Sequence, residues 1–354
     1  MFRNIQLLRA CAAVLVLLHH YQLNYLAMGG GNGLLTAVMP YGFIGVDIFF
    51  AISGFIMMHV IGQRPPLATN VRDFLGHRFL RIYGWYLPCM AFGLAIMASY
   101  DPDGFARVDL LRSATLTSVE MGRLALPISW SLSYELYFYV MVGLGWFLLG
   151  RTLKLGIWVA LVALTVWCSF VPYQEGKLLS FLTTPSILEF LAGALFYLHK
   201  DTLARRPLLP LYACAALVLL WLGIRYQATN EFIRIRTFGA AALFLLGFFV
   251  TLEQARLFRA GQLAVLLGDA SYSIYLLHLP FITLFHGTGL RELLASGGPL
   301  LAEAGFWAFL LSFLALCVGL HYWVEKPLYQ GLCRLVGLQR ANARPAASPL
   351  RPSV

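Results

Sequence analysis

The feature that most constrains this chain is a series of apolar stretches, each about as long as a helix that crosses a bilayer. We count ten of them, of roughly 16 to 22 residues each, which predicts ten transmembrane helices. The predicted spans are Ile5 to Tyr25, Gly42 to Ile61, Ile82 to Ser99, Pro127 to Leu149, Leu155 to Val171, Pro185 to Leu198, Leu208 to Ile224, Thr237 to Leu252, Ser271 to Phe285 and Pro299 to Tyr322. Only 12% of the 354 residues are charged, against about 25% in soluble domains. The sequence therefore predicts an all-α, polytopic membrane protein.

Most of the 26 Lys and Arg residues fall on the side of the membrane where the chain begins. The positive-inside rule makes this side the cytoplasm, and an even number of spans places both termini there. The local exception is an outer loop that contains Arg225, Arg234 and Arg236. We expect one membrane-embedded domain over residues 1–335 and a disordered cytoplasmic tail over residues 336–354. The expected location is the inner (plasma) membrane.

The composition also argues against several classes of protein. The net charge of +10 comes from scattered residues and not from a basic stripe, so we expect no nucleic-acid partner. The six cysteines show no CxxC spacing, and we expect neither disulfides nor a metal site. The first apolar stretch is interrupted by a charged residue, and we expect it to be retained and not cleaved as a signal peptide.

The first span carries ionisable residues at both ends, with Arg9 near its start and His19 and His20 near its end. Such residues are costly inside a membrane unless they face a protein interior or a wet cavity, so they indicate function. Arg9 and His20 are eleven residues apart, which places them on one helix face about 16 Å apart in depth.

The second span places Asp47 about one turn from its outer end, at a depth similar to that of His20. A histidine and carboxylate pair would fix the imidazole tautomer, as a general base requires. The alternative is that Asp47 caps its helix at the membrane interface. Gly45 and Gly54 in the same segment would let neighbouring helices approach closely.

Arg78 and Arg81 lie one helical turn apart at the start of the third span. Two guanidinium groups on one face make a good phosphate clamp, because each offers two parallel donors. Anchoring at the cytoplasmic surface would explain the same pair equally well. Glu325, which follows the last span, is expected to lie at that surface and is a possible partner for either arginine.

Glu135 lies about two turns inside the fourth span, near Trp130 and Ser133. A buried carboxylate needs polar partners, so we expect a polar site there, which either contacts an acceptor or holds the helix in place. Glu189 is expected to be structural and close to the inner half of its span. In the ninth span, Tyr275 and His278 share one side with Ser271, and His278 either lines the cavity of His20 or bonds to a neighbouring helix.

These residues fall into two predicted layers. The inner layer contains Arg9, Arg78, Arg81 and Glu325, and the outer layer contains His20, Asp47, Glu135 and His278. An enzyme that works across the membrane would need both layers. A transporter or flippase would also use intramembrane charges, but that reading gives no reason for the two arginines beside the inner mouth.

Six segments in order resemble the acyltransferase-3 family of integral membrane acyltransferases, which O-acetylate exopolysaccharide and lipopolysaccharide O-antigen. They read IQLLRACAAVLVLLHH, GVDIFFAISGF, RFLR, WSLSYELYFY, SYSIYLLH and EKPL, and together they cover nearly the whole chain. In one departure, Leu136 follows Glu135 where many members have a second acidic residue or Gln. We expect the short, stand-alone form of the family, without the fused periplasmic domain that some members carry.

The resemblance implies transfer of an acetyl group from cytoplasmic acetyl-CoA to a sugar hydroxyl of an exported polysaccharide or glycolipid. It implies that His20 is the catalytic base and that Arg78 and Arg81 handle acetyl-CoA. With Arg9 and Glu325 we assign these two to the cofactor. Asp47 and Glu135 join His20 as catalytic candidates, and the substrate-binding candidates are Trp130, Ser133, Tyr275 and His278. The expected partners are acetyl-CoA, a carbohydrate acceptor, the bilayer and polysaccharide biosynthesis proteins.

Overall fold

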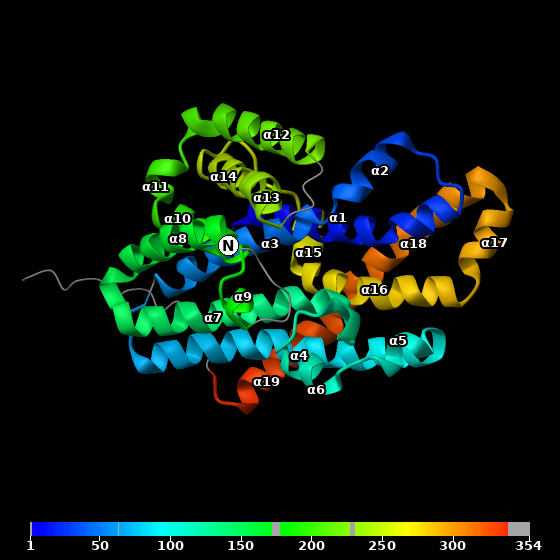
Figure 1. Cartoon of the computed structure of the whole chain (residues 1–354), viewed down its shortest axis with the longest axis horizontal. Helices are drawn as coiled ribbons and strands as arrows, with labels where there is room; N and C mark the ends of the chain where they lie inside the picture. Colours follow the sequence, from blue (N-terminus) through cyan, green and yellow to red (C-terminus); the bar gives the residue numbers. More distant parts are fainter. Residues whose placement is uncertain (1, 63, 172–177, 227–230, 339–354) are drawn as a thin grey trace, which may run out of the picture.

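The computed structural model describes residues 2–62, 64–171, 178–226 and 231–338. Every regular element in those ranges is a helix, which confirms the predicted all-α class (Figure 1). The predicted disordered tail lies outside the described residues from 339 onward. Its first residues are described, and Leu338 is buried against Gly76.

The long helices follow the apolar stretches of the sequence. They are α1 (Arg3–Ala27), α3 (Ile44–Ile61), α4 (Ala68–Tyr100), α7 (Trp130–Leu149), α8 (Leu153–Phe170), α10 (Ile187–Leu198), α12 (Leu209–Arg225), α14 (Ala240–Gln254), α16 (Ser271–Gly287) and α18 (Gly298–Leu320). Each of the predicted stretches falls on one of these helices. Shorter helices connect them, namely α2 (Gly33–Val38), α5 (Pro102–Ala106), α6 (Leu110–Thr115), α9 (Leu178–Leu182), α11 (Lys200–Leu203), α13 (Glu231–Arg234), α15 (Gln262–Asp269), α17 (Leu290–Ser296) and α19 (Lys326–Leu335).

Seven helices in the described ranges are long and apolar enough to span a membrane, or eight if the bent pair α15 and α16 forms one span. The higher of these numbers, eight, is below the predicted ten for two reasons. First, α7 and α8 belong to one apolar run, Pro127–Phe170, which the sequence count divides in two. Second, α1 is not among the seven, because its arginines and histidines lower its mean hydropathy. The chain is a multi-pass membrane protein.

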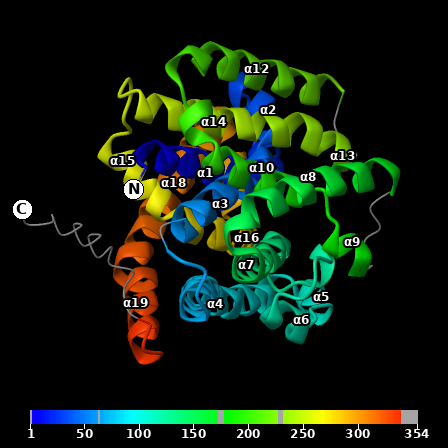
Figure 2. The ribbon, with the colours of Figure 1, turned by 90° about the vertical axis from the view of Figure 1, so that its left-hand side faces the viewer.

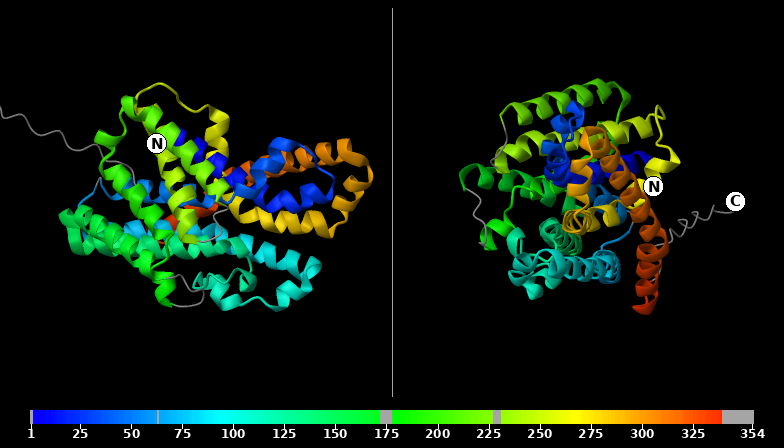
Figure 3. Two further views of the ribbon diagram at one scale, coloured as in Figure 1. Left: turned by 45° about the horizontal axis from the view of Figure 1, so that its top comes forward. Right: turned by 90° about the vertical axis from the view of Figure 1, so that its right-hand side faces the viewer.

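Helix α1 lies in the middle of the bundle, where it packs against α3, α14, α15 and α16 (Figure 2). We call the end of the bundle where α1 begins the near end and the opposite end the far end. The far end carries α2, α5 and α17. There, α16, α17 and α18 join α2 and the second half of α1 in a projecting lobe (Figure 3).

Glycines bring the central helices into backbone contact, as the sequence predicted. A Cβ atom on Gly45 of α3 would lie 2.2 Å from the Ala12 carbonyl oxygen of α1. A Cβ atom on Gly54 would lie 2.0 Å from the Phe190 carbonyl oxygen of α10. Such distances leave no room for any side chain, so these glycines fix the position of α3 between its neighbours.

Helix α4 begins well before the predicted third span. It starts at Ala68 and runs for 33 residues, so Arg78 and Arg81 lie inside a helix and not in a loop ahead of one. The outer gap between residues 100 and 126 is folded into α5, α6 and the 3-10 turn η2 (Met121–Arg123). Two π-helical segments, η6 (Ile235–Gly239) and η7 (His321–Glu325), interrupt the later helices. Each lies beside a charged contact described below.

Gly54→Ala should lower the stability of the protein, because the new methyl group overlaps the backbone of α10. We expect a loss of about 1–3 kcal/mol and a lower Tm in detergent, measured by thermal unfolding. Gly331→Ala in α19 is the matched control, since nothing lies within 4 Å of its Cβ position. Equal melting of the Gly54 variant and the wild type would contradict the close packing of α3 and α10.

Candidate active site

A cavity of about 440 Å³, which we call the inner cavity, lies between α1, α3, α4, α7 and α16. Its wall combines aliphatic and aromatic side chains with a set of polar ones. The polar lining residues are Gln6, Arg9, Ser53, His59, Arg78, Arg81, Ser131, Glu135, Tyr139, Ser271, Tyr272 and Tyr275. They come from segments far apart in the sequence, so only the packing of these five helices against one another brings them together.

Three arginines of the predicted inner layer share this cavity. Arg9 donates from Nη2 and Nε to the Ser271 hydroxyl oxygen, at 2.9 and 3.2 Å. The guanidinium carbon of Arg78 lies 5.4 Å from the ring centre of Tyr139. Among the described residues, no carboxylate lies within 4 Å of the Arg9, Arg78 or Arg81 guanidinium. The cavity therefore carries positive charge that an anionic ligand can neutralise.

Glu135 also faces the inner cavity, which corrects its predicted place in the outer layer. Its Oε1 atom accepts hydrogen bonds from the Ser53 hydroxyl at 2.9 Å and from the Tyr139 hydroxyl at 2.5 Å. The sequence analysis placed Glu135 on α7 but could not identify its neighbours. Its carboxylate attracts the arginines of the same cavity without contacting them.

A second, wider hollow of about 1020 Å³, which we call the vestibule, adjoins the inner cavity at the near end. Arg78 and Arg81 line both spaces, so the two arginines stand where one leads into the other. Arg81 is exposed although it lies deep in the protein, because its open surface faces these cavities. The other basic residues of the vestibule are Arg64, His77 and Arg334.

Glu325 does not pair with Arg78 or Arg81. It is buried and accepts hydrogen bonds from the Ser273 hydroxyl at 2.6 Å and from His321 Nδ1 at 2.9 Å. The π-helical turn η7 places Glu325 against α16 instead of α4. Its charge still attracts the Arg81 guanidinium from beyond contact distance. Glu325 therefore does not line the inner cavity and acts on Arg81 only through its charge.

His20 and His278 form a bonded pair in the outer layer. His20 Nδ1 lies 2.9 Å from the Val16 carbonyl oxygen, so this nitrogen carries the hydrogen. His278 Nδ1 lies 2.6 Å from the Tyr275 carbonyl oxygen and also carries a hydrogen. In a neutral ring, His278 Nε2 is then an acceptor, and it lies 3.2 Å from His20 Nδ1. Both contacts keep the hydrogen of His20 on Nδ1 and leave its Nε2 with a free lone pair.

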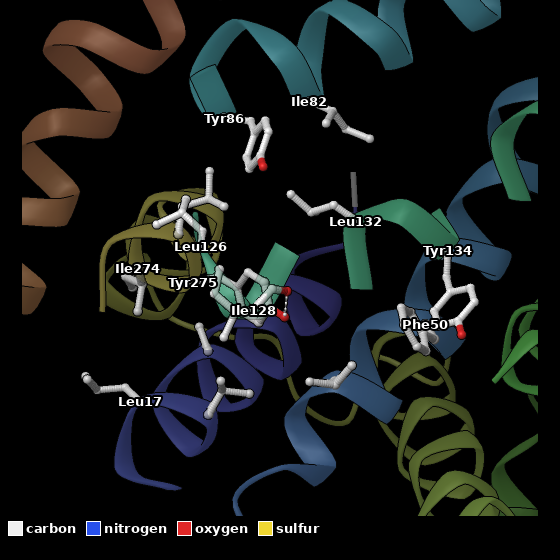
Figure 4. Close-up of a cluster of buried hydrophobic side chains, with 14 of the residues drawn as sticks. Leu17, Phe50, Ile82, Tyr86, Leu126, Ile128, Leu132, Tyr134, Ile274 and Tyr275 are labelled. Atoms are coloured by element: carbon white, nitrogen blue, oxygen red, sulfur yellow. Dashed lines mark hydrogen bonds between the residues drawn. The ribbon is translucent and has the colours of Figure 1, made fainter. Parts of the chain in front are cut away.

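Tyr275 connects this histidine pair to the inner cavity, which it lines. Its hydroxyl donates to the Ile128 carbonyl oxygen at 2.9 Å and lies 2.7 Å from the Ser131 hydroxyl (Figure 4). Its ring centre lies 5.8 Å from that of His278. His20 itself does not line the inner cavity, so the Tyr275 ring separates the arginines from the histidines.

Asp47 lies in a different cluster from the one predicted. It is fully buried and accepts a hydrogen bond from Arg234, and Glu189 lies within hydrogen-bonding reach of it. Its side chain neither contacts His20 nor caps α3. Glu189 lies at the start of α10 beside Asp47, toward the far end, and not in the inner half of its span. Arg234 is one of the three arginines that the sequence analysis placed in an outer loop, as an exception to the positive-inside rule. Its ion pair with Asp47 accounts for its position.

Two predicted substrate residues also lie away from the inner cavity. Ser133 donates its hydroxyl hydrogen to the Ser118 carbonyl oxygen at 3.0 Å and lines a separate hollow. Trp130 packs edge-on against Phe50 and Tyr134. Both point away from Glu135, because positions one, two or five residues apart lie on different faces of a helix.

The sequence analysis missed Ser53, Ser131 and Tyr139 as lining residues. For two of them a signal exists, because Ser131 and Tyr139 lie four residues before and after Glu135 and so share its face. Ser53 carries no such signal, since it is brought to Glu135 only by the packing of α3 on α7.

A family model described as an acyltransferase domain matches residues 2–324. The chain belongs to the acyltransferase-3 family. The exopolysaccharide production protein ExoZ of Rhizobium meliloti (strain 1021) is 30% identical over 302 residues, which cover 81% of this chain and 89% of that protein. No solved structure matches the chain. Membership of this acyltransferase family agrees with the enzyme reading of the charged cavity.

The acyltransferase-3 match includes every helix that lines the inner cavity and both histidines. It ends one residue before Glu325, so α19 with its part of the vestibule lies beyond the matched residues. The match to the family thus covers the inner cavity and the two histidines fully, and the vestibule only in part.

Arg234→Met should destabilise the protein strongly, because it leaves two buried carboxyl groups facing each other without a cation. Breaking a buried ion pair costs about 3–5 kcal/mol, and we expect a clear drop in Tm. The double variant Asp47→Asn/Arg234→Met should recover part of the loss. Arg225→Met is the matched control, since Arg225 is an exposed arginine of the same outer region. If the Asp47→Asn protein has a normal Tm but transfers little acyl group, Asp47 is again a candidate catalytic residue.

Proposed function

We propose that this protein transfers an acetyl group from acetyl-CoA at the near end to a sugar hydroxyl at the far end, with His20 as the general base. The observation that carries the proposal is the position of Tyr275, which lines the cavity of the arginines and also packs against His278, the partner of His20. The near end would face the cytoplasm, where acetyl-CoA is made, and the membrane would be the plasma membrane.

The inner cavity suits the acyl-bearing end of the donor by its charge and its volume. Coenzyme A is a polyanion with a long, flexible thioester arm. Arg9, Arg78 and Arg81 offer guanidinium donors with no carboxylate within 4 Å among the described residues, and guanidinium forks suit phosphates. The volume of about 440 Å³ lies within the usual range for ligand pockets, about 300–1000 Å³. Glu135 would balance part of this charge and position Ser53 and Tyr139, and would not itself react.

The tautomer of His20 suits a general base. Its Nε2 would take the proton of the sugar hydroxyl as the hydroxyl oxygen attacks the thioester carbonyl carbon. The carbon–sulfur bond then breaks, and the coenzyme A thiolate takes the proton from the imidazolium. General-base catalysis of this kind contributes about 10²- to 10⁴-fold. A relay through an acetyl-imidazole would use the same nitrogen in two steps.

The acceptor is proposed from the family and from the relative. The name of the R. meliloti protein links it to exopolysaccharide production, and a growing or exported polysaccharide presents its hydroxyl groups on the outer side. Proteins of polysaccharide biosynthesis would then be natural partners. A transporter or flippase remains the competing class, and the acyltransferase family favours the enzyme.

His20→Gln should abolish acetyl transfer, with a loss of at least about 10²-fold, while the protein inserts and melts normally. The measurement is transfer of label from radiolabelled acetyl-CoA to polysaccharide in membrane vesicles. His19→Gln is the matched control, since His19 is the adjacent histidine and bonds to the Met39 carbonyl instead. Near-normal acetyl transfer by the His20 variant would show that His20 is not the general base.

His278→Phe should slow transfer about 3- to 10-fold, which is the effect of one neutral hydrogen bond that holds the His20 tautomer. The KM for acetyl-CoA should not change, because the arginines lie on the other side of Tyr275. A raised KM for the acceptor with unchanged kcat would instead mean that His278 binds the sugar, as the sequence suggested.

A further inference from the structure

The vestibule is a basic hollow whose ligand the proposed function leaves open. It takes Arg64 from the loop after α3, His77 and two more arginines from α4, and Arg334 from α19. No Asp or Glu residue is among the described residues that line it. Arg64 and Arg334 have no carboxylate within 4 Å in the described part of the chain. This excess of positive charge is suited to a ligand with several negative charges.

The wall of the vestibule is held in place by side-chain contacts between α4 and α19. His77 of α4 lies 3.0 Å from the Tyr329 hydroxyl and 3.6 Å from the Cys333 sulfur of α19. Leu338 packs on Gly76, where a side chain would collide with it. These contacts hold α19 against α4 and thereby fix Arg334 opposite the arginines of α4.

Aromatic side chains line the same space. Phe74, Trp146 and Tyr329 contribute rings to the vestibule, beside its basic residues. Rings next to guanidinium groups suit a nucleotide, because the base can stack while the phosphates pair with the arginines. A simple inorganic anion would need no such rings.

We propose that the vestibule binds the phosphorylated nucleotide of the acyl-CoA donor, with Arg64 and Arg334 on its phosphates. Arg78 and Arg81 then stand where the chain of the donor passes from the vestibule into the inner cavity. This inference rests on the proposed function, since it assigns a subsite to the same donor. It divides the donor between a wide polar entrance of about 1020 Å³ and a narrower reaction chamber of about 440 Å³.

The experiment measures binding by titration calorimetry on purified full-length protein, with coenzyme A, 3′-dephospho-coenzyme A and pantetheine as probes. Arg64→Gln and Arg334→Gln should each weaken coenzyme A binding about tenfold, because each removes a charge-assisted hydrogen bond to phosphate. Binding of pantetheine, which has no nucleotide, should not change. Arg72→Gln is the matched control, since Arg72 is a largely exposed arginine of α4 that pairs with Asp73 outside the vestibule.

The outcomes separate this inference from the proposed function. If the wild type binds coenzyme A and both variants bind it equally well, the vestibule assignment is wrong and the donor assignment stands. If the wild type binds no coenzyme A, the donor assignment itself fails. Equal weakening of coenzyme A and pantetheine would mean that the arginines shape the whole cavity, which also overturns the nucleotide site.

A membrane lipid is another source of phosphate, and a second arm of the experiment tests it. The same titrations are run in nanodiscs of phosphatidylcholine and of phosphatidylglycerol. The nucleotide site predicts the same ratio of variant to wild-type affinity in both. An effect of the Arg64 and Arg334 substitutions that appears only with phosphatidylglycerol would assign the vestibule to a lipid headgroup and overturn the proposal.

Discussion

The structure depends on the cost of placing a charged side chain within an apolar bundle. Arg9 lies on α1, and its guanidinium finds a partner only inside the protein, at Ser271 of α16. Helix α1 is therefore surrounded by other helices, and Gly45 lets α3 approach it closely enough to close the bundle. The central position of α1 makes it a shared wall for the inner cavity at one end and for the histidine pair at the other.

Two of the buried carboxylates have hydrogen-bond donors close by, whereas the arginines of the inner cavity have no carboxylate within 4 Å among the described residues. Asp47 has Arg234, and Glu325 has Ser273 and His321. The arginines of the inner cavity have only hydroxyl and aromatic neighbours within contact distance, among the residues that the structure describes. An unbalanced positive cavity of this kind is what an anionic donor needs, and the same imbalance continues into the vestibule. The acyltransferase-3 family implies an acyl donor, and we propose that this charge binds it.

The sequence by itself determined the fold class, because apolar length and low charge leave only a helical membrane protein. It also determined which residues share a helix face, so Arg9 and His20 were grouped on α1, and Arg78 with Arg81 on α4. The close approach of helices at Gly45 and Gly54 was predictable too, since small residues in an apolar helix favour it. In each case the pattern that carries the prediction lies within one helix.

Only the tertiary structure decided which helix each face meets. Asp47 is turned to Arg234 instead of His20, and Glu135 faces the cavity of the arginines instead of the histidines. Helix geometry gives depth and face from the sequence, whereas the rotation of one helix against another depends on all its packing contacts. For that reason Glu135 and Asp47 do not lie in the layer predicted for them. The hydrogen bond between His20 and His278, which sets the tautomer of His20, is likewise seen only in the folded chain.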